Sequence, residues 1–218
     1  VNPKIFLRPD TELEEVSLEY NSKSSSVSLL SSANIINISS EELLKAACCN
    51  LAESFETTPS IDVNFSDAIS GRKQINMLGL SSPNILMSVE NIPSIRGALQ
   101  SYGLTYIPGT WIESMQVAKG SGSVVNGYES ISGQINTELR KPLTDDKFFL
   151  NLFANAMERL ELNAHYTSNL NNKLDHGLYF HTNKKATSAD NNNDGFRDSP
   201  TGEQLNILNR FQYTNLDK

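Results

Sequence analysis

Short strand-like runs separated by turn-forming residues fill the middle of this 218-residue chain, from residue 69 to residue 142. The runs cover residues 74–80, 85–91, 111–119 and 133–139. Clusters of Gly, Pro, Ser and Asn lie between them, and such clusters are typical of turns. This segment therefore predicts a small unit built on short strands rather than on long helices.

A helix is predicted ahead of this segment. Ser39 and Ser40 can cap the first free N–H groups of a helix, and the carboxylates that follow suit the positive end of its dipole. Apolar residues then recur at the spacing of one helix face: Leu43, Leu44, Ala47, Leu51 and Phe55. The pattern predicts one amphipathic helix of about four turns that ends before Pro59. With the strands, it indicates a mixed α/β unit.

The character of the chain changes after Pro142. Four runs of about eight to ten residues, the length that a tilted membrane strand needs, cover residues 148–155, 160–167, 175–182 and 205–214. In the second and fourth runs apolar side chains alternate with polar ones, so each strand has one apolar and one polar face. This period fits a lipid-facing wall around a wet lumen, and it also fits a half-buried sheet of a soluble protein.

The order of these parts resembles the plug domain of TonB-dependent outer-membrane transporters, of the type found in Bacteroidetes. A strand ending in Gly79-Leu80 is followed by a strand ending in Asn-Ile-Pro at residues 91–93, and a long loop follows. The chain then reads Ile-Glu-Ser-Met-Gln-Val-Ala-Lys-Gly at 112–120, Asn-Gly-Tyr at 126–128 and Ser-Gly-Gln-Ile-Asn at 132–136. The resemblance spans about residues 38–218 and is strongest over residues 69–142.

The resemblance implies a fold and a division of the chain. The fold is an α+β plug domain, a small mixed sheet with short helices, followed by antiparallel strands of a transmembrane β-barrel. Residues 1–32 would be the end of an upstream domain and a linker, residues 33–142 the plug, and residues 143–218 the first barrel strands of a longer protein. If the first strand rises from the periplasm, the connections 156–159 and 183–202 lie outside and 169–173 is a periplasmic turn.

The resemblance also implies a function, which is energy-coupled import of a scarce nutrient through a plugged barrel in the outer membrane. The cargo could be a siderophore, cobalamin, a metal, a peptide or a glycan. TonB, with its inner-membrane energising complex, would pair by strand addition with Leu13, Glu14, Glu15, Val16, Ser17 and Leu18. An ordinary acidic linker is the alternative for these six residues. Ligand contacts are expected on outward plug loops, at Ser81, Ser82, Asn84, Arg96, Gln100, Tyr102 and Tyr106.

The chain departs from the family pattern at three positions. Leu78 stands where many plugs carry Arg, Gln116 where many carry Glu, and Lys119 where Arg is frequent. These positions often form a charged lock between plug and barrel. The resemblance therefore does not predict how strongly charged contacts hold the plug in the barrel in this chain.

Two features suggest metal binding. In the last long loop Asp190, Asn192, Asp194 and Asp198 have the oxygen spacing of a calcium loop, but the closing position is Thr201. A plain solvated loop is the alternative. The adjacent Cys48 and Cys49 are either small buried helix residues or thiols of a soft-metal site that would also use Met77, Met87 or Met115. His176 and His181 lie an odd number of residues apart on one strand, which predicts that they face opposite ways.

Composition and charge limit the remaining classes. A net charge of −7 with scattered Lys and Arg argues against nucleic acid. No nucleophile with a neighbouring base and no paired carboxylates are recognisable, so we expect no enzyme and no required cofactor. Outer-membrane lipid is the other expected partner. The competing hypothesis is a soluble periplasmic or surface binding module in which the strands from residue 148 onward complete a small sheet.

Overall fold

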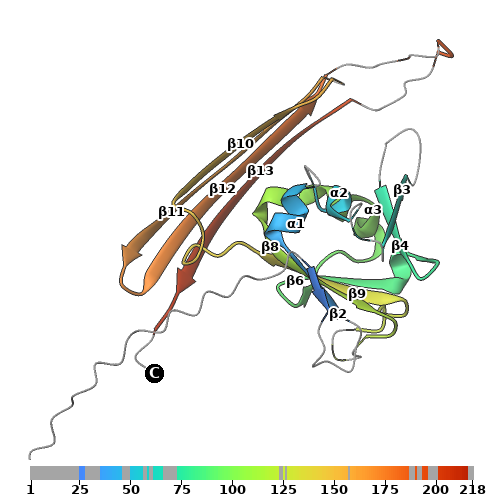
Figure 1. The fold of residues 1–218 in the computed structure, drawn as a ribbon, viewed down its shortest axis with the longest axis horizontal. Coiled ribbons are helices and arrows are strands. Elements are labelled where there is room, and N and C mark those ends of the chain that lie inside the picture. The colour runs from blue at the N-terminus through green and yellow to red at the C-terminus, as the bar shows by residue number, and fades with distance from the viewer. Residues whose placement is uncertain are drawn as a thin grey trace, which may run out of the picture.

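The computed structural model describes residues 25–27, 35–45, 50–55, 58, 61–65, 73–122, 125, 127–156, 158–186, 190, 193–195 and 201–215. Its strands form three sheets, of six, four and three strands. The six- and three-stranded sheets and the helices form an α/β unit, and the four-stranded sheet stands beside it (Figure 1). The predicted order, a mixed α/β unit followed by antiparallel strands, is confirmed. No helix within the described ranges is both long and apolar enough to cross a membrane.

The six-stranded sheet forms the floor of the α/β unit. Its strands, in chain order, are β1 (Ser25–Val27), β2 (Ile35–Ser39), β6 (Ile85–Val89), β7 (Ile92–Pro93), β8 (Ile112–Lys119) and β9 (Gly133–Leu139). They lie in the order β1-β2-β8-β9-β6-β7. Only the pair of β6 and β9 is parallel among these strands, so the sheet is mixed as expected.

A small sheet and short helices complete the unit. The sheet contains β3 (Asp62–Phe65), β4 (Lys73–Met77) and β5 (Leu80–Ser81). The helices are α1 (Ser40–Lys45), α2 (Leu51–Ser54) and α3 (Gln100–Tyr106), with single turns η1 (Ser82–Asn84), η2 (Gly97–Leu99) and η3 (Gly109–Trp111). The buried side chains between helices and sheets form one core that includes Leu51, Phe55, Met77, Leu104, Met115 and Ile135. These residues come from every part of the unit, so their burial holds the helices onto both sheets.

The single predicted helix is wrong, because α1 and α2 are separate. Asn50 adopts an extended backbone, with φ −151° and ψ 170°, which no α-helix contains. Its side-chain oxygen accepts a hydrogen bond from the N–H of Glu53 and so caps α2. Asn competes with the helix for backbone groups and is favoured at such caps. The apolar spacing hid this break because both helices turn their apolar side chains toward the same core.

The predicted strand 74–80 is likewise broken. Leu78 and Gly79 have φ values of 51° and 78°, and they form a tight turn between β4 and β5. Positive φ at both central residues gives the turn the twist that two paired strands need. Glycine is expected there, but leucine adopts this region only with strain. The turn places the Leu78 side chain in solvent.

The four-stranded sheet, here called the wall, is a simple antiparallel meander. It contains β10 (Phe148–Ala154), β11 (Arg159–Asn171), β12 (Leu174–Lys185) and β13 (Gly202–Tyr213), paired in chain order. The last three strands are longer than the predicted runs because their polar ends continue the pairing. Strands of this length extend well past the α/β unit (Figure 1).

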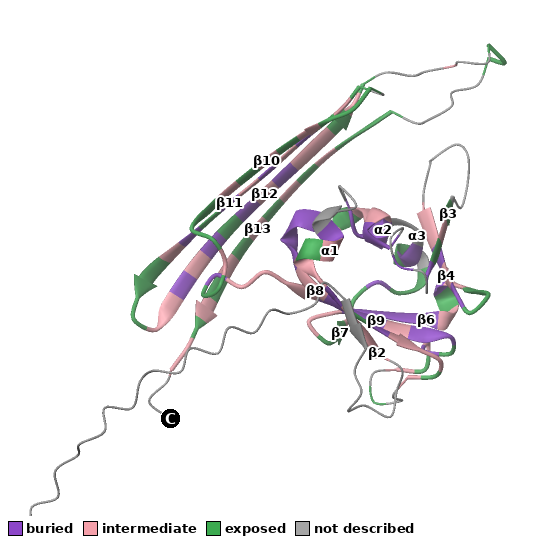
Figure 2. Ribbon diagram, in the orientation of Figure 1, coloured by how far each residue is buried: buried purple, intermediate pink, exposed green. Residues whose placement is uncertain are grey.

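The two faces of the wall differ sharply in polarity. The face turned away from the α/β unit carries exposed apolar side chains: Phe148, Leu150, Leu152, Leu160, Tyr166, Leu178, Leu205, Ile207, Phe211 and Tyr213. The opposite face carries Glu161, Asn163, His165, Thr167, Asp175 and His181, all buried. Burial alternates with exposure along β11 and β12 (Figure 2). The polar face is therefore the one that the α/β unit covers.

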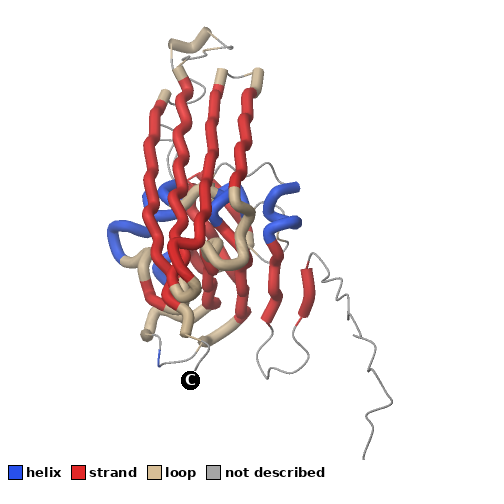
Figure 3. The backbone as a smooth tube through the Cα atoms, turned by 90° about the vertical axis from the view of Figure 1, so that its left-hand side faces the viewer, coloured by secondary structure: helices blue, strands red, loops and turns tan. Residues whose placement is uncertain are grey.

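The wall stands along one side of the α/β unit. In Figure 1 the α1 helix and the beginning of β8 lie on the side nearest the wall, and β3 and β4 lie on the far side. Turned by 90°, the wall strands stand upright in front of the unit (Figure 3). The chain crosses from unit to wall between the end of β9 at Leu139 and the start of β10 at Phe148.

Candidate functional site at the seam

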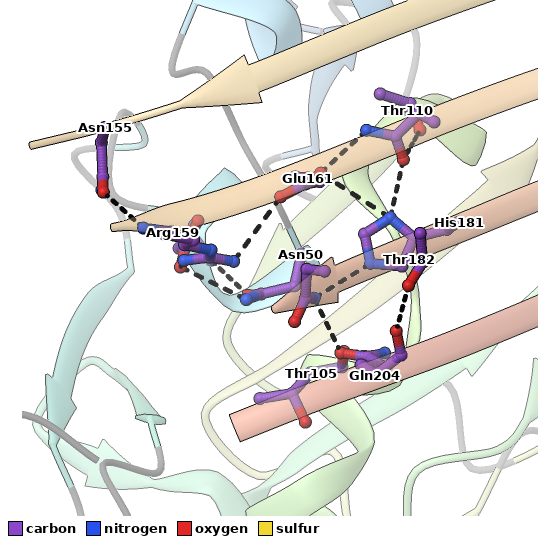
Figure 4. Close-up of polar contacts among 12 residues, drawn as sticks. Asn50, Thr105, Thr110, Asn155, Arg159, Glu161, His181, Thr182 and Gln204 are labelled. Carbon is purple, nitrogen blue, oxygen red and sulfur yellow. Dashed lines mark hydrogen bonds and ion pairs between the residues drawn. The ribbon is translucent and has the colours of Figure 1, made fainter. Parts of the chain in front are cut away.

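The seam between the α/β unit and the wall is built from polar side chains. We describe it as two groups, which lie at different places along β11 and β12. The first, the exit knot, consists of Arg140, Asp145, His165 and Tyr179 and lies where the chain leaves the unit. The second, the Glu53 cluster, consists of Glu53, Lys73, Arg159 and Glu161. Figure 4 shows Arg159 and Glu161 of the second group with their neighbours.

Asp145 is the centre of the exit knot. Its carboxylate accepts a hydrogen bond from the guanidinium of Arg140 at 2.9 Å and one from the hydroxyl of Tyr179 at 3.3 Å. His165 Nε2 lies 3.2 Å from the same carboxylate. Arg140 Nε also donates to the carbonyl of Thr110 at 2.9 Å. The connecting segment is thus bonded to the unit behind it and to the wall ahead of it.

Aromatic packing closes the exit knot. The rings of Trp111 and Tyr179 meet edge to face with centroids 6.2 Å apart, and His165 stacks on Phe149 at 4.7 Å. Gly177 makes room for this packing, because a Cβ at that position would lie 2.8 Å from the ring of Tyr179 and 3.0 Å from Cγ of Pro142. β12 therefore needs glycine at position 177, because any side chain there would collide with Tyr179 and with Pro142 of the connecting segment.

Thr110 joins the two groups. Its hydroxyl donates to Oδ1 of Asn163 at 2.9 Å, and Nδ2 of Asn163 donates to Glu161 at 2.8 Å. His181 Nδ1 lies 2.7 Å from Oδ1 of Asn163, an acceptor, and His181 Nε2 lies 3.1 Å from Nδ2 of Asn183, a donor. These partners assign the proton to Nδ1. Both ring nitrogens of His181 therefore have partners without a charge on the imidazole.

The Glu53 cluster ties the N-terminal part of the unit to the wall. Oε1 of Glu53 lies 3.0 Å from a guanidinium nitrogen of Arg159 on β11 and 3.7 Å from Nζ of Lys73 on β4. Arg159 also lies 3.7 Å from the carboxylate of Glu161 (Figure 4). Two carboxylates and two cations therefore alternate across the seam, so the cluster carries no net charge.

β13 adds a row of contacts along its inward face. Gln204 donates to the carbonyl of Thr105 at 2.9 Å, and Asn206 donates to the carbonyl of Tyr106 at 2.5 Å. Further along, Arg210 lies 2.6 Å from the carboxylate of Glu90 in the turn between β6 and β7. β13 thus contacts both the end of α3 and the β6–β7 edge of the six-stranded sheet.

The predicted ligand residues of the first loop lie near the start of β6. Ser81 is half-buried in β5, and Ser82 is buried, with its hydroxyl bonded to the backbone of Ile75 at 3.1 Å. Asn84 is half-buried, and its carbonyl accepts from the N–H groups of Ile131 and Ser132, both at 3.0 Å. Their polar groups are largely used inside the unit, and their ligand role stays a prediction.

The predicted residues of the second loop are more varied. Gln100 is buried and donates to the carbonyl of Ser82 at 2.9 Å, which joins the two predicted loops. Arg96 is exposed and paired with Glu129 at 2.7 Å, and the side chain of Tyr106 is exposed. The side chain of Tyr102 lies outside the described part of the chain. Arg96 and Tyr106 are thus the described members of the set with exposed side chains, and their ligand role stays a prediction.

The other predicted sites are described only in part. The TonB-pairing residues 13–18, Cys48, Cys49, Asn192 and Asp198 lie outside the described residues. The carboxylate of Asp190 accepts from the N–H groups of Asp194 and Gly195 at 3.2 and 3.0 Å, which is a turn of the backbone. The described residues bring no three His, Cys, Asp or Glu side chains together in a metal-binding group. Calcium binding by this loop stays a prediction.

Sequence reasoning did not single out the seam. The opposite facing of His176 and His181 is confirmed, since His181 is fully buried and His176 packs against Phe211 on the apolar face. The alternation also marked 161, 163 and 165 as one face. The alternation could not show which residues cover this face, because Thr110 and Glu53 come from distant parts of the chain.

Comparison with known proteins decides the family. Residues 28–134 match the family described as the TonB-dependent receptor plug domain. This chain carries the plug domain of a TonB-dependent receptor. The α/β unit is this plug, and the predicted resemblance is confirmed.

Solved structures agree at the level of fold. The ferric-catecholate import receptor Fiu from E. coli K12, in its open form, has a TM-score of 0.65 at 16% identity, over 83% of this chain and 24% of that one. The alcaligin outer-membrane receptor FauA from Bordetella pertussis has 0.60 at 13%, over 72% and 27%. The copper transporter OprC has 0.63 at 13%, over 90% and 30%. This chain thus spans less than a third of the length of each.

Proposed function

We propose that this chain is the plug and the first wall strands of an outer-membrane receptor that imports a scarce nutrient with energy supplied through TonB. The observation that supports the proposal is the seating of the plug on the polar face of a sheet whose other face is apolar. A soluble module would leave that apolar face in water, where such large patches are rare on monomers. In a bilayer the same face meets lipid. The function is transport rather than enzyme catalysis.

The polarity of the seam suits a plug that shifts. Hydrogen bonds between plug and wall exchange for hydrogen bonds to water, so each neutral bond contributes only about 0.5–1.5 kcal/mol net and each bond to a charged group about 1.5–3 kcal/mol. An apolar seam would instead lose free energy in proportion to the area exposed. The row Gln204, Asn206 and Arg210 can therefore part from the plug at modest cost and form again. The plug keeps its own apolar core throughout.

The proposed division of the chain follows from this role. The predicted boundary at residue 33 is too late, because β1 (Ser25–Val27) pairs with β2 in the plug sheet and the family match begins at residue 28. The end of an upstream domain and a linker would therefore lie before residue 25, the plug would extend to residue 142, and residues 143–218 would be the first wall strands. The segment from Leu13 to Leu18 would pair with TonB in the periplasm by strand addition, in which main-chain hydrogen bonds supply affinity. The long connection between β12 and β13 would lie outside the cell. The short turn between β11 and β12 would face the periplasm.

Ligand contact is proposed at the exposed plug residues Arg96 and Tyr106, together with the others predicted on the same loops. An Arg and a Tyr side chain can pair with or stack on a bulky polar ligand. The similar structures bear names that refer to ferric catecholate, alcaligin and copper. These names belong to those proteins, and the class of nutrient for this chain is left open among siderophore, cobalamin, metal, peptide and glycan.

The test uses the full-length receptor in a Gram-negative host. Val16→Pro removes a backbone donor from the proposed TonB-pairing segment, and Ser22→Pro makes the same change in the polar stretch that follows. We expect uptake of at least one probe, among ferric catecholate, cobalamin and radioactive copper, to require TonB and to be lost in Val16→Pro only. Uptake that does not depend on TonB, or recovery outside the outer membrane, would overturn the proposal.

A further inference from the structure

The apolar face of the wall is hollowed near one end. The hollow has a volume of about 440 Å³ and lies across β10, β11 and β12. On this face it is lined by Leu152, Ala154, Leu160, Leu162, Thr182 and Lys184. It is separate from the plug, because these side chains point away from the seam. Nothing in the proposed transport cycle uses it.

The register of the strands explains the hollow. Leu152, Leu162 and Thr182 form one row across the three strands, and Ala154, Leu160 and Lys184 form the next. The small side chains of Ala154 and Thr182 thus stand among leucines and leave a depression. The hydroxyl of Thr182 donates to the carbonyl of Gln204 at 3.0 Å, so it needs no partner from the hollow. The floor is therefore apolar in practice.

Lys184 lies at the edge of the apolar band. At the other end of the wall, the same face carries the rings of Phe148, Tyr166, Phe211 and Tyr213. Tyr213 pairs with Leu174, and from Leu174 to Lys184 the strand rises roughly 33 Å. With the usual tilt of barrel strands this is roughly 25 Å along the membrane normal, the height of a lipid-facing band. Aromatic rings thus mark one membrane interface and Lys184 the other.

Lys184 is available to a ligand at that interface. Its side chain is 65% exposed, and the carboxylate of Glu203, with which it pairs, is 79% exposed and 3.7 Å away. Exposed pairs of this kind contribute little, so an anion can replace Glu203 at small cost. A cation beside an apolar hollow at a membrane interface has the chemistry of a lipid site, with charge for a phosphate and surface for an acyl chain.

We propose that this hollow binds an acyl lipid with a phosphorylated head group from the outer leaflet of the membrane. The phosphate lies at Nζ of Lys184, and one acyl chain lies over Leu160, Leu162 and Thr182. The inference rests on the proposed function, since it requires this face to meet lipid and the β12–β13 connection to be external. A protein partner is less well matched, because the side chains that line this face of the hollow on β10–β12 are apolar apart from Thr182 and Lys184.

The experiment measures lipid binding to the full-length receptor by native mass spectrometry. Dipalmitoyl phosphatidic acid and dipalmitoylglycerol are titrated separately, and they differ only in the phosphate. Lys184→Gln should weaken phosphatidic acid binding about five-fold and leave dipalmitoylglycerol unchanged. Thr182→Trp fills the hollow and should weaken both lipids about ten-fold or more. Ala154→Phe, on the same floor, should act like Thr182→Trp and guards against a folding defect in either variant.

Two controls change the same chemistry elsewhere. Lys173→Gln removes a cation at the opposite end of the wall, and Ile207→Trp adds a ring to the same face outside the hollow. Neither should alter binding by more than about two-fold. Equal losses in Lys173→Gln and Lys184→Gln, or in Ile207→Trp and Thr182→Trp, would overturn the inference. So would a dimer of the receptor that Thr182→Trp abolishes, since a second copy would then occupy the face.

The two proposals fail in different ways. If the receptor does not fractionate with the outer membrane, the proposed function fails. If it is found there and takes up a probe through TonB, but shows no preference for phosphatidic acid over dipalmitoylglycerol, only the lipid site fails.

Discussion

The exit knot and the Glu53 cluster hold the same two parts together in different ways. Arg140 and Asp145 are 5 residues apart, and their side chains are 16% and 2% exposed. Glu53 and Arg159 are 106 residues apart, and theirs are 18% and 22% exposed. The central ion pair of the exit knot thus joins residues close in sequence, and its carboxylate is buried. The ion pair of the Glu53 cluster joins residues distant in sequence, and water reaches both of its partners. The seam thus combines a local ion pair with a buried carboxylate and a long-range ion pair that is more exposed to water.

The largest effect is expected from removing the centre of the exit knot. Asp145→Ala removes the only carboxylate that pairs with the half-buried guanidinium of Arg140 in the described exit knot, and it leaves Arg140 and Tyr179 with carbonyl partners alone. Breaking a buried ion pair in this way costs about 3 kcal/mol of unfolding free energy. Urea titration of the full-length protein in lipid vesicles measures the loss. A loss below about 1 kcal/mol would show that the knot is no more rigid than an exposed pair.

The packing of the exit knot gives the next largest effect. Gly177→Ala places a methyl group 2.8 Å from the ring of Tyr179, so the ring or Pro142 must move. Overpacking of this kind costs about 1–3 kcal/mol. Gly202→Ala is the matched control, because a Cβ at that position meets nothing within 4 Å. The same urea titration should separate the two variants, and equal midpoints would refute the packing argument.

A smaller effect is expected at the Glu53 cluster. Glu53→Gln removes the charge that faces both Lys73 and Arg159, but water can reach these groups. We expect a loss of about 1 kcal/mol, reduced further at high salt because screening weakens the remaining pairs. Glu203→Gln, in an exposed pair on the apolar face, should change stability by less than about 0.5 kcal/mol. A loss equal to that of Asp145→Ala would erase the contrast.

The smallest effect is expected from the neutral contacts of β13. Gln204→Ala removes one hydrogen bond to the carbonyl of Thr105, which water can replace. Hydrogen exchange of the α3 amides should rise only about two-fold, in line with a net contribution near the low end for such bonds. Gln116→Ala, at an exposed position of β8, should leave α3 exchange unchanged. A larger rise for Gln204→Ala would make β13 a principal support of α3.

Much of the fold followed from the sequence, and the failures have local causes. β9 was predicted to the residue, and β8 and β10 to within one residue at either end. Three errors lie at Asn50, at Leu78 and at Glu90-Asn91, where the predicted strand 85–91 ends at Val89; a side-chain cap and two left-handed turns override the apolar pattern. The spacing of apolar residues predicts neither a helix cap nor a left-handed turn. Asn50 was readable as a cap, but leucine at Leu78 gives no sign of a positive φ.

The seam was harder to predict than the strands. Period-two alternation places Glu161, Asn163 and His165 on one face, and the structure confirms that sharing. It cannot show that Thr110 lies opposite Asn163, because that contact joins residues 53 positions apart. The departures at Leu78 and Gln116 left the lock in doubt. Glu53 and Arg159 now provide a charged contact between plug and wall at other positions.

The order of strands in the six-stranded sheet bears on how the chain is made. β2 pairs with β8, and β6 pairs with β9, so early segments wait for partners that leave the ribosome much later. Such non-local pairing slows folding and leaves strand edges open in the meantime. The plug therefore cannot assemble progressively from its N-terminus, and the nascent chain must be kept from aggregating until residue 139 has been delivered.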